Sequence, residues 1–158
     1  MPVQAKKKGN RGELECSKLL NEKFGEKIFT RTQASGGYIG GGNRKNSSYL
    51  TEEQQLAFVS DLVCPIWFRF VIEHKSYADK AVLWDFFNES SDVNKWFKQV
   101  ENDASFVKKQ PLLIVKYNQH KRICWIKEKL DFYIFEYKGW YCYNFSDLLN
   151  LPNEFFRI

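Results

Sequence analysis

The sequence predicts one α/β domain in which a mixed central β-sheet is flanked by helices, and three observations lead to that prediction. The chain has 158 residues, a length typical of a single domain. Hydrophobic residues make up 44% and charged residues 27%, the balance of a globular protein rather than a disordered one. Apolar patterns follow one another as helix, strands, helix, strands, with no linker between them, which favours one fold over residues 1–158.

Two segments carry the apolar spacing of an amphipathic helix. In residues 11–24, Cys16 and Leu20 recur at helical intervals. In residues 92–108 the stripe consists of Val93, Trp96, Phe97, Val100, Ala104 and Val107. Glu13 lies on the apolar face of the first helix, where a carboxylate is unfavourable unless it has a partner or a metal. Glu13 is therefore a candidate site residue, although a helix-end glutamate near solvent would give the same pattern.

Short apolar runs predict the strands of the sheet. They cover residues 28–32, 59–64, 66–75, 112–117, 122–126, 131–136 and 140–144. The middle of the 66–75 run is apolar on both faces, so we expect this strand at the centre of the sheet. Ser146 is a suitable N-cap for a short last helix.

The net charge is +5, and the whole surplus of basic residues lies in the first third of the chain. Residues 1–50 contain 10 Lys or Arg against 4 Asp or Glu. We expect a basic N-terminal arm over about residues 1–10 and a Gly-rich mobile loop over about residues 34–50, since five of the nine glycines fall within residues 36–42. This distribution suits a polyanion such as nucleic acid, or simply a solvated tail that promotes solubility.

The cysteines and the apolar runs indicate the cellular compartment in which we expect the protein. The four cysteines form no Cys-x-x-Cys pair and only two histidines accompany them, so we expect free thiols in a reducing compartment rather than a zinc site. No apolar run reaches the ~18 residues of a membrane span, and the N-terminus lacks the hydrophobic stretch of a signal peptide. We therefore expect a cytoplasmic protein of a bacterial or archaeal cell or of a virus-infected host, with no membrane partner.

Three carboxylates and one ammonium group are candidates for a catalytic site. Asp61 interrupts an apolar strand, and Glu73 and Lys75 share one face of the next strand because side chains two residues apart point the same way. If these strands pair as a hairpin, Asp61 lies beside them, and Glu13 can approach from the packed helix. Carboxylate oxygens bind Mg²⁺, which can activate water for phosphodiester hydrolysis. An ordinary salt bridge of Lys75 with a strand carboxylate is the other interpretation.

Four stretches, taken in order, carry a family resemblance. They are Lys8-Gly9-Asn10-Arg11-Gly12-Glu13, Arg31-Thr32-Gln33-Ala34-Ser35-Gly36-Gly37, Ser60-Asp61-Leu62-Val63 and Val71-Ile72-Glu73-His74-Lys75-Ser76. Together they resemble the motifs of the PD-(D/E)XK nuclease superfamily, and within it the Holliday junction resolvases of archaea and their viral relatives. Ser60 stands where that family usually has proline. The resemblance implies a restriction-endonuclease-like core.

The resemblance also implies an activity and assigns roles. It implies a metal-dependent, structure-selective endodeoxyribonuclease, specifically a Holliday junction resolvase that hydrolyses phosphodiesters in branched DNA. Asp61 and Glu73 correspond to ligands of Mg²⁺, for which Mn²⁺ can substitute. Glu13 corresponds to a ligand of a second ion or water, and Lys75 to the activating residue. A serine implicated in strand cleavage corresponds to Ser35.

Basic and polar side chains around these motifs are the predicted DNA contacts, which position the backbone without reading bases. They are Lys8, Arg11, Arg31, Ser35, Arg44, Lys45, Gln99 and Lys116. Gln99 falls where many superfamily members carry a supporting glutamine. Resolving a four-way junction needs two symmetric cuts, so a homodimer is expected. The candidates for its interface, unless they belong to the core, are Trp84, Phe86, Phe87, Trp140 and Tyr141.

Two alternatives remain open from the sequence. The same scaffold serves nucleases of restriction, nicking and end processing, so a different DNA substrate is the first alternative. The second is a DNA-binding module without catalysis. Buried carboxylates that lack a metal would destabilise such a module, which favours the enzyme.

Overall fold

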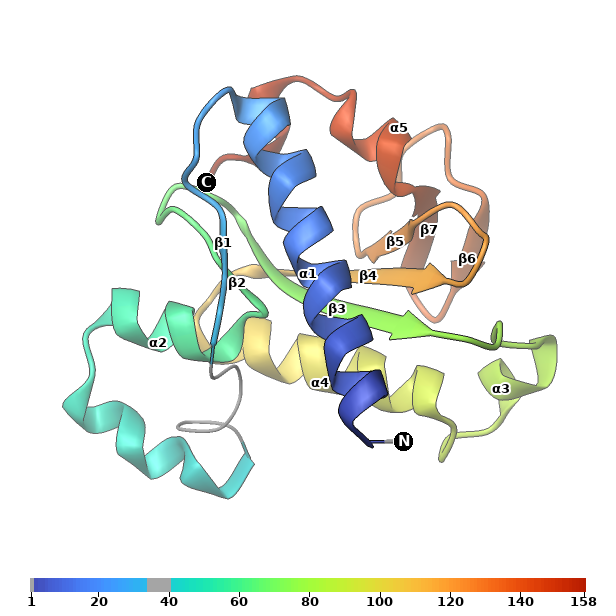
Figure 1. Cartoon of the computed structure of the whole chain (residues 1–158), viewed down its shortest axis with the longest axis horizontal. Helices are drawn as coiled ribbons and strands as arrows, with labels where there is room; N and C mark the ends of the chain where they lie inside the picture. Colours follow the sequence, from blue (N-terminus) through green and yellow to red (C-terminus); the bar gives the residue numbers. More distant parts are fainter. Residues whose placement is uncertain (1, 34–40) are drawn as a thin grey trace.

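Helices and strands alternate along the chain in the computed structural model, which describes residues 2–33 and 41–158 (Figure 1). The helices are α1 (Pro2–Phe24), α2 (Glu52–Val59), α3 (Leu83–Phe87), α4 (Asp92–Phe106) and α5 (Phe145–Leu149), with 3₁₀ helices η1 (Gly41–Tyr49) and η2 (Asn153–Phe156). The strands are β1 (Thr30–Arg31), β2 (Leu62–Val63), β3 (Phe70–Tyr77), β4 (Gln110–Tyr117), β5 (Ile123–Ile126), β6 (Phe135–Tyr137) and β7 (Trp140–Asn144).

A five-stranded sheet in the order β3-β4-β5-β7-β6 forms the middle layer, between α1 on one face and α4 on the other (Figure 1). β3 and β4 run parallel, and the other neighbours run antiparallel. β1 and β2 form a separate antiparallel pair. The predicted class, a mixed sheet flanked by helices, is confirmed. In the two described ranges, no helix is long and apolar enough to cross a membrane.

Each face of the sheet is covered by the apolar stripe of one long helix. Cys16 and Leu20 of α1 pack with Ile72 and Ile114 of the sheet. On the opposite face, the stripe of α4 packs against inward side chains of β4 and β5. Its members and their partners are Val93, Trp96, Phe97, Val100, Leu113, Val115 and Trp125. All four cysteines are free.

The strand predicted at residues 66–75 is buried, as expected, but its predicted position at the centre of the sheet is wrong. β3 begins at Phe70 and its first five residues are buried, but it is the first strand of the sheet rather than a central one. The continuous apolar run arises because α1 and α4 cover both faces of this edge strand. Helices on both sides therefore imitate the sequence pattern of a central strand.

The first half of the chain contains more helix than predicted. α1 begins at Pro2, so the basic segment expected as an arm continues the first helix. The Gly-rich region was expected to exclude helix, yet η1 spans Gly41–Tyr49; residues 34–40 of the expected mobile loop lie outside the described residues. α2 was missed, although Thr51 and Gln54 form a reciprocal capping box, a signal readable in the sequence.

Smaller differences concern the strands and the last helix. The segment of residues 59–64 ends α2 and contributes only the two-residue β2, which pairs with β1 and not with β3. The predicted strand at residues 131–136 begins only at Phe135 as β6, and that at residues 28–32 is reduced to β1. The N-cap of α5 is Asn144 rather than Ser146. The tertiary contacts of these short segments, rather than local propensity, set their limits.

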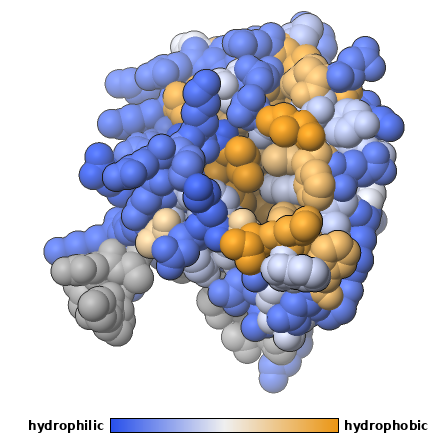
Figure 2. All heavy atoms as spheres, turned by 90° about the vertical axis from the view of Figure 1, so that its right-hand side faces the viewer, coloured by the Kyte–Doolittle hydropathy of each residue, from blue (hydrophilic) through white to orange (hydrophobic). Residues whose placement is uncertain are grey.

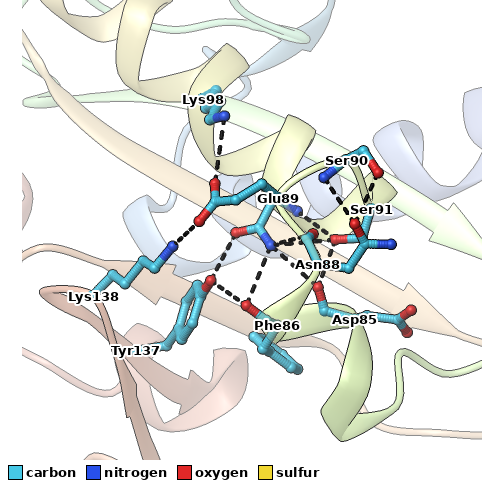
Figure 3. Close-up of polar contacts among 10 residues, drawn as sticks. Asp85, Phe86, Asn88, Glu89, Ser90, Ser91, Lys98, Tyr137 and Lys138 are labelled. Carbon is cyan, nitrogen blue, oxygen red and sulfur yellow. Dashed lines mark hydrogen bonds and ion pairs between the residues drawn. The ribbon is translucent and has the colours of Figure 1, made fainter.

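A polar network holds the unpredicted helix α3 against the sheet layer (Figure 3). The buried Asn94 amide donates to the carbonyl oxygens of Asp85 at 3.1 Å and Asn88 at 2.8 Å. The Tyr137 hydroxyl lies 2.5 Å from the carbonyl oxygen of Phe86 and 2.9 Å from Asn94 Oδ1. These contacts fix the orientation of a helix that is too short to be stable alone.

Gly12 allows α1 to approach β3 closely. A Cβ atom at this position would lie 2.3 Å from Ser76 Oγ and 2.6 Å from His74 Cε1. Both distances are well inside van der Waals contact, so only glycine permits this packing without a shift of the helix. Gly9, one turn earlier on α1, has nothing within 4 Å of a built Cβ.

We predict that Gly12→Ala lowers the free energy of unfolding by about 1–3 kcal/mol, the usual range for overpacking. Gly9→Ala is the matched control, and it should be neutral or stabilising by up to about 1 kcal/mol, because alanine favours helix. Urea unfolding of both variants measures the difference. A second change, Ser76→Ala, should restore part of the loss in Gly12→Ala. Equal stabilities of the two glycine variants would contradict the close approach.

Candidate active site

Three acidic side chains reach one region from three separate elements. Glu13 projects from α1, Asp61 lies just before β2, and Glu73 is in the middle of β3. Asp61 and Glu73 are 8% and 3% exposed, and the side chain of Glu13 is 14% exposed. Asp61 interacts electrostatically with both glutamates. The fold thus brings together the three carboxylates that the sequence singled out.

Asp61 is held in place by hydrogen bonds to the outer edge of β3. Its N–H donates to the carbonyl oxygen of Ile72 at 2.9 Å, and its Oδ2 accepts the N–H of His74 at 2.7 Å. Its carbonyl oxygen accepts the N–H of Thr32 at 2.9 Å. The sequence analysis considered a hairpin between the strands of Asp61 and Glu73. Instead, these hydrogen bonds, which we call the clasp, hold the Asp61 carboxylate beside the strand that carries Glu73.

Ser60 adds to the same clasp. Its hydroxyl accepts the N–H of Ile72 and lies at hydrogen-bond distance from the Ile72 carbonyl oxygen, both at 3.1 Å. The side chain therefore satisfies backbone groups that a neighbouring strand would otherwise satisfy. A proline at this position would offer no such hydroxyl.

Lys75 follows Glu73 on the same face of β3 and forms an ion pair with it. The Lys75 ammonium also lies 3.5 Å from Gln99 Oε1 on α4. Burial lowers the pKa of Lys75, but the charge and hydrogen bond of Glu73, together with Asp61, outweigh burial and raise it. Lys75 is therefore a positively charged group that Glu73 and Gln99 hold in a defined place.

His74, between these two residues, belongs to the opposite face and does not join them. Its ring lies against Gly12 of α1, and Arg122 Nε is 3.4 Å from His74 Nε2. Burial, followed by the positive charge of Arg122, lowers the pKa of His74 to about 3. The imidazole is neutral at physiological pH and packs under α1.

Glu13 forms an ion pair with Arg31, which the sequence analysis predicted to contact DNA. Arg31 Nε lies 2.5 Å from Glu13 Oε2, and Arg31 Nη2 donates to Asn10 Oδ1 at 2.6 Å. Burial and the nearby Asp61 raise the pKa of Glu13, while Arg31 opposes this effect. Arg31 thus compensates the charge at the rim of the carboxylate site.

A fourth carboxylate, Asp103 of α4, was not predicted from the sequence. It follows Gln99 by four residues, so the two side chains share one face of the helix. Burial raises the pKa of Asp103 to about 6; Arg44, 3.7 Å away, lowers it and Asp61 raises it. The spacing from Gln99 is a signal that could have identified Asp103.

Glu13, Glu73 and Asp103 each interact electrostatically with Asp61, and the oxygens of all four carboxylates are of the chemical type that binds divalent cations. Burial and the negative charge of Asp61 raise the pKa of Glu13 and of Glu73, so ionising either glutamate beside Asp61 is unfavourable. Hard carboxylate oxygens are the ligands that Mg²⁺ and Mn²⁺ prefer. Within residues 2–33 and 41–158, no group of three or more Asp, Glu, His or Cys side chains is arranged so that it could hold a metal ion. Instead, Lys75 and Arg31 contact the glutamates.

Three of the other predicted DNA contacts, Arg11, Arg44 and Lys45, differ in their relation to this site. Arg11 is exposed and pairs with Glu15 at 3.0 Å. Arg44 pairs with Asp103 and stacks on Phe106, and Lys45 beside it is exposed. Arg44 thus contacts a site carboxylate, whereas Arg11 lies on the side of α1 where Glu15 also pairs with Arg122.

Three further predicted contacts have other surroundings. Lys8 is half-buried on α1. Lys116 pairs in register with Ser76, so it belongs to the α1 face of the sheet, and its ammonium donates to the carbonyl oxygens of Tyr117 and His120. The fold therefore does not bring Lys116 to the carboxylates. Ser35 lies outside the described residues.

The mixed sheet between two helices thus carries buried acidic groups and a lysine on its edge strand, the combination on which the resemblance to PD-(D/E)XK nucleases rests. Comparison with family models agrees: the family described as "Phage putative PDDEXK endonuclease" matches residues 4–145. The chain belongs to this family, and its fold is the restriction-endonuclease-like fold that the sequence predicted. Nucleases of this type use divalent metal ions and act on DNA. No curated protein and no solved structure matches the chain.

We predict that Mg²⁺ stabilises the wild-type protein through the acidic side chains. At one hundred times its Kd, Mg²⁺ should raise the free energy of unfolding by about 2.7 kcal/mol. Thermal unfolding with Mg²⁺ and with EDTA measures this difference. Asp61→Asn should abolish it, whereas Glu15→Gln, on the same helix as Glu13 but paired with Arg11 and Arg122, should retain it. A full shift in Asp61→Asn would contradict the site.

We also predict a pH-dependent effect of Asp103. Its pKa is about 6 in the folded protein against an ordinary value of 3.8, so the native state binds more protons in this interval. Stability from this group therefore falls as pH rises from 3.8 to 6 and is constant above it. Asp103→Asn removes the effect, so the variant should gain stability over wild type across this interval. Denaturation at several pH values tests this, with the exposed Asp79→Asn as the control.

Proposed function

We propose that the protein is a Mg²⁺-dependent endodeoxyribonuclease that hydrolyses DNA phosphodiesters at this site. The observation that carries the proposal is the buried Asp61 clasped to β3 beside the Glu73–Lys75 pair. These residues lie within residues 4–145, which match the family of phage endonucleases, and they are the residues that resemble the acidic and lysine motifs of PD-(D/E)XK nucleases. A non-catalytic DNA-binding module would gain nothing from burying these like charges together.

Each side chain has a role that its surroundings support. Asp61 and Glu73 would hold Mg²⁺, with Glu13 as a ligand of a second ion or of water. When bound, the metal would polarise the phosphoryl oxygen and lower the pKa of a water molecule. Because its pKa is raised, Lys75 stays protonated, so it orients the attacking water and stabilises the developing phosphoryl charge rather than acting as a base. Gln99 positions the Lys75 ammonium.

We predict that Asp61→Asn and Glu73→Gln abolish Mg²⁺-dependent cleavage while DNA binding is unchanged or tighter, because less negative charge faces the phosphates. Lys75→Ala should lower the single-turnover rate by about 10²–10³-fold with little change in Kd. Cleavage of labelled DNA with Mg²⁺ or EDTA provides the measurement, and Glu15→Gln serves as the control. Wild-type rates in Asp61→Asn would refute the assignment. A raised Kd with an unchanged rate in Lys75→Ala would make it a simple DNA contact.

The finer proposal is a Holliday junction resolvase that works as a homodimer. One site cuts one strand, and symmetric resolution needs two. Support comes from α3, where Trp84 and Phe87 are 75% and 71% exposed. Figure 2 shows apolar side chains gathered around a hollow on the side of the molecule where α3 lies. The network around Asn94 holds this surface rigid.

The other aromatic candidates for an interface differ from these two. Trp140 is buried in the core beneath α4, so it cannot join an interface, and Phe86 is packed against the same cluster. Tyr141 is partly buried against the α1-side core. The proposed interface is therefore confined to α3 and its neighbours.

We predict that the protein sediments as a dimer at micromolar concentration with DNA present, and that Trp84→Ala weakens this dimer. Cleavage of a labelled four-way junction should exceed cleavage of the matching duplex. Mixed dimers of wild-type and Asp61→Asn subunits should nick a junction once without resolving it. A monomer, or equal cleavage of both DNAs, would exclude the resolvase and favour a restriction, nicking or end-processing nuclease.

A further inference from the structure

A second strongly charged feature lies away from the carboxylates, where β3 and β4 begin. A pocket of ≈ 430 Å³ is lined by five basic side chains and a single acidic one. They are Arg69, Lys108, Lys109, Lys127, Arg157 and Glu128. These residues come from four separate parts of the chain, none of which was singled out by the sequence analysis.

Two of these cations are fixed by the fold. Arg69 pairs with Glu128, and its guanidinium carbon lies 4.7 Å and 4.5 Å from the ring centroids of Phe70 and Phe155. Its Nε is buried and has no hydrogen-bond partner in the described structure. Lys109 donates to the carbonyl oxygen of Ile66 at 2.7 Å. Arg69 and Lys109 therefore give the pocket a cationic wall that the fold holds in place.

The other cations are less neutralised. Lys108 and Arg157 are exposed, and neither forms an ion pair with any residue in the described ranges. Lys108 adopts a left-handed φ of 57° just after α4, and Arg157 lies 4.2 Å from the Trp67 ring centroid. Lys127 pairs with Glu101 at 3.0 Å. The wall and these side chains together leave a net positive pocket suited to an anion.

The shape favours a polymer over a single small anion. A second hollow of ≈ 380 Å³ shares Lys108 and Lys109 with the pocket and continues along Phe106 towards α2. Arg44, which pairs with Asp103, stacks on Phe106. Lys108 and Lys109 at one end of this hollow, and Arg44 on Phe106, are thus the basic side chains between the pocket and Asp103; Glu52 is the acidic residue in the lining of the hollow.

The distances along the fold suit the spacing of a DNA backbone. Arg69 precedes Glu73 by four residues, which is about 13 Å along a strand. Lys108 follows Asp103 by five residues, which is about 8 Å along a helix. Successive nucleotides of one strand rise about 3.4 Å along the duplex axis. A strand cut at the carboxylates could therefore reach the pocket within a few nucleotides.

We infer that this basic pocket binds the phosphodiester backbone of the DNA substrate, a few nucleotides from the cleaved bond. The inference rests on the proposed nuclease function and adds a second contact region to it. Lys108 and Arg157 supply exposed positive charges, and Arg69 and Lys109 supply cations that the fold holds in place.

The test compares two double variants that remove equal charge. The double variant Lys108→Gln/Arg157→Gln removes the positive charges of the two exposed basic side chains that line the pocket. Lys98→Gln/Lys138→Gln is the control; both lysines pair with Glu89 beside α3 (Figure 3), and Lys138, like Lys108, has a positive φ. Binding of a labelled duplex in EDTA is measured by anisotropy at several salt concentrations. The pocket variant should raise Kd about tenfold and reduce the slope of log Kd against log salt by about two, and the control should match wild type.

The outcomes separate this inference from the proposed function. If wild type binds and cleaves DNA but both double variants bind equally, the pocket inference fails and the nuclease stands. If wild type binds no DNA, both fail. Thermal unfolding with inorganic phosphate gives the second comparison. If the pocket variant binds DNA more weakly, and phosphate stabilises the variant and wild type equally, the pocket is a site for a polymer. If phosphate stabilises wild type alone, the inference is overturned in favour of a site for a small anion. Arg157→Lys, which keeps the charge, should retain the wild-type salt slope; loss of that slope would mean that stacking on Trp67, not charge, matters.

Discussion

The hydrogen bonds between the Ser60–Asp61 segment and the outer edge of β3 are the constraint on which the active site depends. Without them Asp61 would have no fixed relation to Glu73, because β2 pairs with β1 and not with the main sheet. The same bonds also satisfy the backbone groups of Ile72 on an otherwise open strand edge. One short segment therefore protects the sheet edge and positions the carboxylate that we propose to be catalytic.

The burial of several carboxylates at the site opposes folding stability, and the metal binding that we propose would relieve this cost. Burial raises the pKa of Glu13, Glu73 and Asp103, so their ionised forms are unfavourable in the native state. Lys75 and Arg31 offset part of this effect by pairing with the glutamates. Such residual strain is expected at a functional site, because a set of groups already satisfied by one another would have little affinity for a cation.

The two long helices, α1 and α4, contribute different side chains to the site. α1 carries Glu13 and, through Gly12, packs closely enough on β3 for that glutamate to reach Asp61. α4 carries Gln99 and Asp103 on one side of the same strand, and its last turn leads to the basic pocket. The C-terminal strands, which the sequence identified only as extra sheet, complete the aromatic core beneath α4.

The sequence by itself determined the class of fold, the two long helices and the acidic and lysine motifs. Strong helical periodicity and the strand spacing of Glu73 and Lys75 are local patterns, and local patterns are readable from one chain. The sequence did not reveal that β3 lies at an edge, that Asp61 is held by a clasp rather than a hairpin, or that Asp103 joins the site. Those features depend on contacts between segments far apart in the chain, which periodicity does not encode. The basic pocket is the clearest case, since Arg69, Lys108 and Arg157 become neighbours only when the strands and the C-terminus pack together.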